Sequence, residues 1–90
     1  MSPSSDVVIA ARLPEQVALH ARPAGRFVQA AAAFPCAVVV AANGKRANAK
    51  SILEVLGLGA TGGTELELSA SGEHAAEAVE RLAALVRTLD

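Results

Sequence analysis

Residues 65–70 read Glu-Leu-Glu-Leu-Ser-Ala, a strict alternation of polar and apolar side chains. Because successive side chains of a strand point to opposite faces of a sheet, this pattern predicts a strand with one wet face and one buried face. Helices can then cover only the buried face of the sheet. The stretch therefore favours a two-layer α+β fold in which the other face of the sheet stays open.

The remaining strands follow from apolar, β-branched runs and one tight turn. Residues 7–11 predict a buried first strand, and residues 37–41 predict a second strand. Asn43-Gly44 is a strong hairpin signal, so residues 45–47 are expected to form a short return strand. Together with the alternating strand, these segments predict a four-stranded antiparallel sheet.

Three helices are expected among these strands. Apolar residues at helical spacing predict helices at about 21–33 and 73–88. A shorter helix over 52–56 follows a capping box, in which Ser51 accepts a hydrogen bond from the Glu54 amide and the Glu54 side chain reaches back. The order β-α-β-β-α-β-α indicates an open-faced sandwich with the three helices on one face of the sheet. The 90 residues are expected to form a single domain.

Two groups of glycines bear on this fold. Gly25 weakens the first helix by about 1 kcal/mol relative to alanine, which suggests that something approaches the backbone closely there. Gly59, Gly62 and Gly63 predict a flexible turn before the alternating strand. The Gly62-Gly63 pair is not expected to bind phosphate, because it lacks the Gly-Lys-Ser/Thr ending of a phosphate-binding loop.

Composition argues against several classes of function. The net charge of −1 and the absence of Tyr and Trp argue against a nucleic-acid-binding surface. Cys36 is the only cysteine and no Cys/His pair has zinc spacing, so no internal disulfide, metal or cofactor is expected. Residues 1–6 lack a basic segment followed by an apolar run, and no apolar stretch approaches the length of a membrane span. We therefore expect a soluble cytoplasmic protein.

The candidate functional stretch is Leu-His-Ala-Arg-Pro-Ala at residues 19–24, where the first helix begins. It places His20 at a helix N-terminus, where unpaired backbone N–H groups and the helix dipole attract anions. An imidazole there can carry a phosphoryl group, whose oxygens the amides of Ala21 and Arg22 and the Arg22 guanidinium can bind. Pro23 suits the first turn because its ring presets the helical φ. The residues alone leave open that His20 is only a cap or a surface group.

Taken together, the segments resemble the HPr family, the histidine-containing phosphocarriers of the bacterial phosphoenolpyruvate-dependent sugar phosphotransferase system. The likeness covers nearly the whole chain. It includes residues 19–24, Phe27-Val28, Gly44-Lys45, Asn48 to Ile52, Leu58-Gly59, Gly62, the alternating strand and the final helix. The family's fold, a four-stranded antiparallel sheet covered by three helices, agrees with the order of elements expected here.

The resemblance implies roles for individual positions. His20 matches the family's phosphorylated histidine, which phospho-enzyme I modifies on Nδ1 and a sugar-specific enzyme IIA discharges. Arg22 matches the arginine that steadies the phosphoryl group, and Ser51 matches the serine that an HPr kinase phosphorylates in some bacteria. Ala18 stands where the family usually has glycine, and the loop is expected to adapt. The protein is thus expected to be a carrier, a substrate of phosphotransferases rather than an enzyme.

Donor and acceptor proteins must reach the same nitrogen, so we expect an exposed site beside an apolar patch. Ile52, Leu53 and Leu56 lie on a helix too short to bury every side, and the family binds both partners with this region and the first helix, here Ala21 and Arg22. For Leu53 and Leu56, burial in the core is the alternative. We expect a monomer that docks its partners transiently.

Other interpretations stay open from the sequence. The carrier could serve a regulatory, nitrogen-related branch, or the protein could act through phosphorylated Ser51 as a corepressor of a transcription factor. It could also be an α+β interaction module that is not phosphorylated. Ser51 could be only a helix cap, and Arg22 only a solvated residue of the first turn. His74, expected in the first turn of the last helix, is interpreted as a surface residue, and Cys36 as a small buried hydrophobe.

Overall fold

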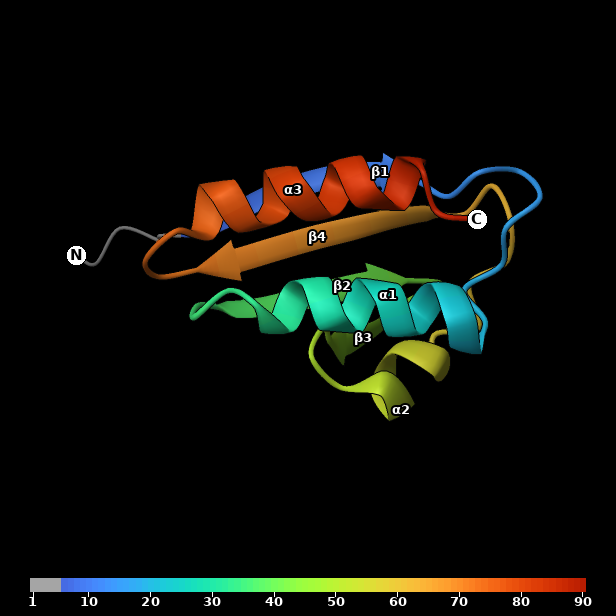
Figure 1. The fold of residues 1–90 in the computed structure, drawn as a ribbon, viewed down its shortest axis with the longest axis horizontal. Coiled ribbons are helices and arrows are strands. Elements are labelled where there is room, and N and C mark those ends of the chain that lie inside the picture. The colour runs from blue at the N-terminus through green and yellow to red at the C-terminus, as the bar shows by residue number, and fades with distance from the viewer. Residues whose placement is uncertain (1–5) are drawn as a thin grey trace.

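The alternating segment forms β4 (Glu65–Ser71), an inner strand of an antiparallel sheet in the computed structural model, which describes residues 6–90. β1 (Val7–Arg12) pairs with one side of β4 and β2 (Ala37–Ala42) with the other, while β3 (Lys45–Asn48) pairs with β2. The strand order is therefore β1-β4-β2-β3 (Figure 1). The predicted four-stranded antiparallel sheet is confirmed.

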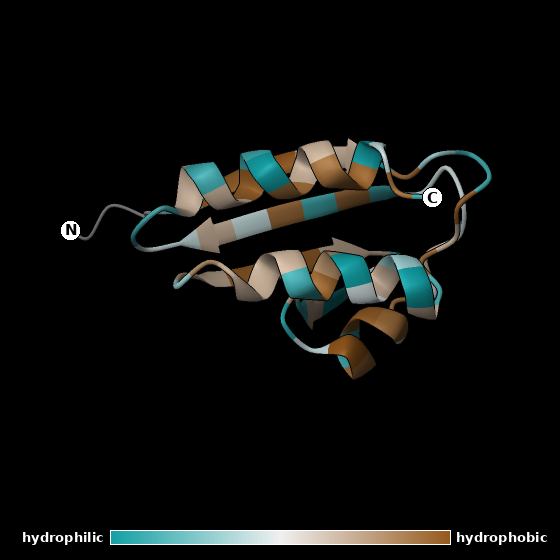
Figure 2. Ribbon diagram, in the orientation of Figure 1, coloured by the Kyte–Doolittle hydropathy of each residue, from teal (hydrophilic) through white to brown (hydrophobic). Residues whose placement is uncertain are grey.

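The register of β4 places its alternating side chains on two different faces. Leu68 is fully buried and lies opposite Ile9 of β1 and Val40 of β2, whereas Glu65 and Glu67 are exposed. Figure 2 shows this alternation as hydrophobic and hydrophilic bands along the strand. One face of the sheet therefore contributes to the core, and the other stays open to solvent.

Three helices cover the buried face, as the sequence predicts: α1 (Ala21–Ala32), α2 (Ile52–Leu56) and α3 (Ala75–Arg87). α3 packs over β1 and β4, and α1 contacts both α3 and α2 (Figure 1). Each helix contributes fully buried side chains to the core, among them Phe27, Val55 and Leu82. Burial of such side chains from both layers is the main source of stability in a domain of this size.

The elements appear in the expected order, with two corrections. β1 is not a buried strand: it forms an edge of a one-sided sheet, and Val8 is 54% exposed. The last helix begins at Ala75 rather than at Glu73, because the chain must reverse after β4 through a turn with positive φ angles, +100° at Gly72 and +66° at His74. His74 is therefore the exposed N-cap residue of α3 and does not lie in its first turn.

The close approach expected at Gly25 is absent. A Cβ built on this residue of α1 would meet nothing within 4 Å among the residues of the described chain. The glycine is therefore not required by the packing of residues 6–90, and its effect on the fold is the ordinary loss of helix propensity.

Candidate functional site

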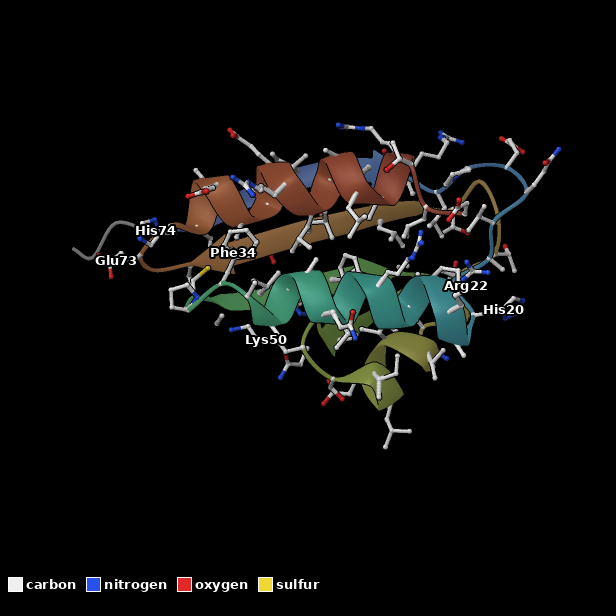
Figure 3. All side chains as sticks on the ribbon, viewed as in Figure 1. His20, Arg22, Phe34, Lys50, Glu73 and His74 are labelled. Atoms are coloured by element: carbon white, nitrogen blue, oxygen red, sulfur yellow. The ribbon has the colours of Figure 1, made fainter. Side chains whose placement is uncertain are left out.

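His20 is the N-cap residue of α1, with φ −81° and ψ −174°, and it is exposed. Its carbonyl accepts a hydrogen bond from the Ala24 N–H at 2.8 Å, while its imidazole makes no capping hydrogen bond. The amides of Ala21 and Arg22 lie in the first turn, where a helix offers them no acceptor, and Pro23 has no N–H. The imidazole is thus accessible beside two backbone donors at the end of the helix (Figure 3).

Arg22 lies in the same turn and is exposed. Within residues 6–90 its guanidinium has no hydrogen-bond or ion-pair partner. Arg26, one turn further along α1, is paired with Asp90 at 2.7 Å between Nη1 and Oδ1. Of these two arginines, only Arg22 is available to an anion next to His20.

The loop before His20 is held by a segment far along the chain. The Leu19 N–H donates to the Ala60 carbonyl at 2.9 Å, and the Leu19 side chain is buried. The His20 N–H donates to the Ala18 carbonyl at 2.8 Å. Ala18 does not have a positive φ, so the backbone at this position does not require the family's glycine.

The glycine-rich turn after α2 packs directly against the same loop. A Cβ at Gly62 would collide with the main-chain carbonyl of Glu15. The Gly63 N–H donates to the Pro14 carbonyl at 3.1 Å. The turn that the sequence indicated as flexible is therefore a packed segment. Gly62 is required there because its main chain lies against that of Glu15.

Asn43 bonds to the segment just after α2, a role that its sequence context did not indicate. With φ +56° at Asn43 and +76° at Gly44, the pair forms the predicted tight turn of the hairpin. In addition, Asn43 Nδ2 donates to the carbonyls of Leu58 at 3.1 Å and Gly59 at 3.4 Å. An Asn-Gly pair signals a turn only, and nothing local to it points to acceptors more than a dozen residues away.

Three apolar side chains of α2 remain accessible next to α1. The exposed fractions are 38% for Ile52, 80% for Leu53 and 37% for Leu56, whereas Val55 is fully buried. Leu53 therefore does not belong to the core. α2 packs against α1, so this apolar patch adjoins the helix that begins at His20 (Figure 1).

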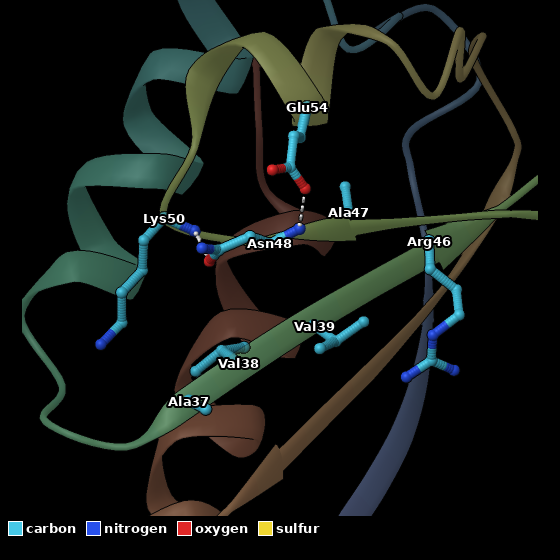
Figure 4. Close-up of a pocket in the computed structure, with 8 residues that line it drawn as sticks. All are labelled: Ala37, Val38, Val39, Arg46, Ala47, Asn48, Lys50 and Glu54. Atoms are coloured by element: carbon cyan, nitrogen blue, oxygen red, sulfur yellow. Dashed lines mark hydrogen bonds between the residues drawn. The ribbon is translucent and has the colours of Figure 1, made fainter.

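Ser51 caps α2, but the expected capping box forms only in part. Ser51 Oγ accepts a hydrogen bond from the Glu54 N–H at 3.3 Å, as predicted. The Glu54 side chain does not reach back to Ser51: its Oε1 accepts from the Asn48 N–H at 2.8 Å (Figure 4). The Ser51 N–H donates to the Asn48 carbonyl. The Ser51 N–H is already bonded to Asn48, and the Glu54 carboxylate instead ties the helix to β3.

A hollow of about 430 Å³ lies on the β2–β3 side of the molecule and includes neither His20 nor Arg22. It is lined by Ala37, Val38, Val39, Arg46, Ala47, Asn48, Lys50 and Glu54 (Figure 4).

In residues 6–90 no cluster of His, Cys, Asp and Glu could hold a metal ion, and none of the three helices is long and apolar enough to cross a membrane. Cys36 is buried, as expected.

The family model described as the phosphorylation site of the HPr component of the phosphotransferase system (PTS-HPr) matches residues 7–88. The chain belongs to the HPr family. It is 55% identical to the phosphocarrier protein HPr of Streptomyces coelicolor over 69 residues, 76% of this chain and 74% of that protein. It is also 48% identical over 69 residues to the HPr-like protein Crh of Bacillus subtilis, covering 77% of this chain and 81% of Crh.

The fold is similar to the crystal structure of HPr from Bacillus anthracis, with a TM-score of 0.87 and 35% identity over 92% of this chain and 99% of that one. Membership of the HPr family confirms the resemblance read from the sequence, and the open-faced sandwich is the fold of HPr. The protein is therefore a phosphocarrier of the phosphotransferase system.

Proposed function

We propose that His20 is the residue on which this HPr protein carries its phosphoryl group. The observation that supports it most is the exposed imidazole at the start of α1, with the Arg22 guanidinium, unpaired within residues 6–90, two positions away. In this proposal His20 Nδ1 attacks the phosphorus of phospho-enzyme I, and the new N–P bond forms as the bond to enzyme I breaks. In a second exchange a nucleophile of a sugar-specific enzyme IIA attacks the same phosphorus, and the N–P bond on His20 breaks as the bond to enzyme IIA forms.

The surroundings of His20 suit a group that gains negative charge. A phosphoryl group carries up to about two negative charges near neutral pH. The amides of Ala21 and Arg22 lie at the positive end of the α1 dipole, and the Arg22 guanidinium adds a full positive charge. Such preorganised donors stabilise the charge that builds up on the phosphoryl oxygens during transfer. Arg22 is in this view a stabilising residue, and His20 the nucleophile.

Partner docking is assigned to the apolar patch of Ile52, Leu53 and Leu56 together with Ala21 and Arg22. The three apolar residues are accessible and adjoin α1, so one partner surface can cover them while reaching His20. An interface built from a few exposed side chains suits a carrier that must release each partner quickly. We further propose a cytoplasmic, monomeric, single-domain carrier that is a substrate of enzyme I and enzyme IIA and not itself an enzyme.

A second, regulatory function is proposed for Ser51. The chain is similar to Crh, a catabolite-repression HPr of Bacillus subtilis, as well as to HPr proteins. Ser51 stands at the start of α2, directly before Ile52 of the apolar patch. A phosphoryl group placed there by an HPr kinase would add charge beside the patch, hinder enzyme I and create a surface for a transcriptional regulator. A carrier for a nitrogen-related branch is the alternative to the sugar branch, which the similarity to HPr proteins favours.

Intact mass after incubation with phosphoenolpyruvate and enzyme I tests the carrier proposal. Wild type should gain one acid-labile phosphoryl group, and His20→Ala should gain none. His74→Ala is the matched control, because His74 is the other histidine and is also exposed at the start of a helix. Phosphorylation of His20→Ala, or its loss in His74→Ala, would contradict the assignment.

A further inference from the structure

The loop that presents His20 lies on the segment of residues 58–64, which leads from α2 to β4. Leu19 bonds to Ala60, Gly63 bonds to Pro14, and Leu13 bonds to Thr64, each through one backbone hydrogen bond of 2.9–3.1 Å. These hydrogen bonds hold the residues before His20 in place, and we call residues 58–64 the template. Any group that fixes the template also fixes the position from which α1 and its N-cap begin.

The start of this template is held by the β2–β3 hairpin. Asn43 Nδ2 donates to the Leu58 carbonyl at 3.1 Å in a partly buried contact, and to the Gly59 carbonyl at 3.4 Å. Lys45 Nζ lies 3.4 Å from the Gly57 carbonyl just before them. Because β2 runs antiparallel to α1, the hairpin turn and the start of α1 lie at the same end of the molecule (Figure 1).

We propose that Asn43 is a positioning residue for phosphoryl transfer through His20. Its side chain fixes the carbonyls of Leu58 and Gly59, the next residue is Ala60, and the Ala60 carbonyl holds the Leu19 N–H one residue before the imidazole. The route from hairpin to His20 thus consists of one side chain and a short run of backbone. The inference rests on the proposed role of His20 and adds a residue that does not touch the phosphoryl group.

Asn43 meets two requirements, one through its backbone and one through its side chain. The backbone of Asn43 is in the left-handed region, at φ +56°, which asparagine and glycine adopt more readily than most residues. The two carbonyls need a donor, which glycine lacks and which aspartate replaces with a carboxylate. Asparagine meets the requirements of both the turn and the template. A substitution that keeps the positive φ but removes the donor can therefore separate them.

Asn43→Gly is the test, because it keeps the turn and removes only the carboxamide. The Leu19 N–H should exchange with solvent about tenfold faster, while the Ala31 N–H near the far end of α1 keeps its rate. The rate of transfer from phospho-enzyme I at a saturating concentration of the carrier should fall about tenfold, since small displacements of a reacting group are costly. The half-saturating concentration should stay the same, because the apolar patch is untouched. Asn43→Asp should slow transfer at least as much.

Val79→Ala is the control for a general loss of stability, since Val79 is fully buried in α3, away from the hairpin. At a temperature where it is folded, it should transfer phosphate at the wild-type rate. Wild-type transfer in Asn43→Gly would overturn the inference, as would slow transfer with an unchanged Leu19 exchange rate. Should His20→Ala still be phosphorylated, the carrier assignment fails instead, while Leu19 exchange still reports on the contact between hairpin and template.

Discussion

Gly62 and the main-chain carbonyl of Glu15 lie so close together that no side chain fits between them. Glu15 belongs to the loop that leads to His20, and Gly62 belongs to the segment after α2. Since the obstacle is backbone on both sides, neither group can rotate away as a flexible side chain would. This contact couples the fold of the site loop to a residue more than forty positions along the chain.

Gly62→Ala should therefore destabilise the protein. Forcing a methyl group into a closely packed site typically costs about 1–3 kcal/mol of unfolding free energy. Urea denaturation followed by circular dichroism would measure the change. A stability equal to wild type would show that the loop moves aside without cost, contrary to the packing described above.

Gly25→Ala should have the opposite effect. A Cβ at Gly25 meets nothing within 4 Å, and alanine favours a helix interior over glycine by about 1 kcal/mol. The same denaturation experiment should show a gain of roughly that size. A loss of stability would reveal a steric conflict at this position of α1.

Arg22→Ala should slow phosphoryl transfer without unfolding the protein. The side chain is exposed and unpaired within residues 6–90, so its removal costs the fold little. It removes a full positive charge beside His20, and loss of such a group typically costs about tenfold or more in rate. Arg26→Ala is the control in initial-rate measurements with enzyme I, because its guanidinium is engaged by Asp90. Equal rates in the two variants would contradict the role of Arg22.

Leu53→Asp should weaken binding of enzyme I about tenfold while leaving the unfolding free energy within about 0.5 kcal/mol of wild type. Leu53 is 80% exposed, so the charge is solvated in the free protein and becomes costly only when a partner covers it. Titration calorimetry would give the affinity. Val8→Asp changes an exposed apolar residue of β1 instead and should bind normally.

Ser51→Ala should destabilise the protein by about 1 kcal/mol, because the Glu54 amide loses its cap. Ser51→Asp keeps an acceptor at the N-cap, so its stability should stay near wild type. Its carboxylate adds negative charge next to the apolar patch, and we expect weaker binding of enzyme I. If Ser51→Asp binds like wild type, charge at this position does not control docking.

Much of the fold could be predicted from short-range patterns in the sequence. The alternation at 65–70 depends only on a period of two, and the Asn43-Gly44 turn on two adjacent residues. Ser51 caps α2 because it stands three positions before the amide it binds. Each of these patterns involves only residues that are close together in the sequence, so it can be recognised without the tertiary structure.

The sequence by itself determined the order of the elements, the open face of the sheet, and the place of His20 and Arg22 at the start of α1. Only the tertiary structure decided that Glu54 bonds to Asn48, that Gly62 meets Glu15, and that Asn43 holds the segment after α2. The first group depends on local periodicity and turn chemistry. The second depends on which distant segments pack together, and their close contacts leave no signal in the neighbouring residues of either partner.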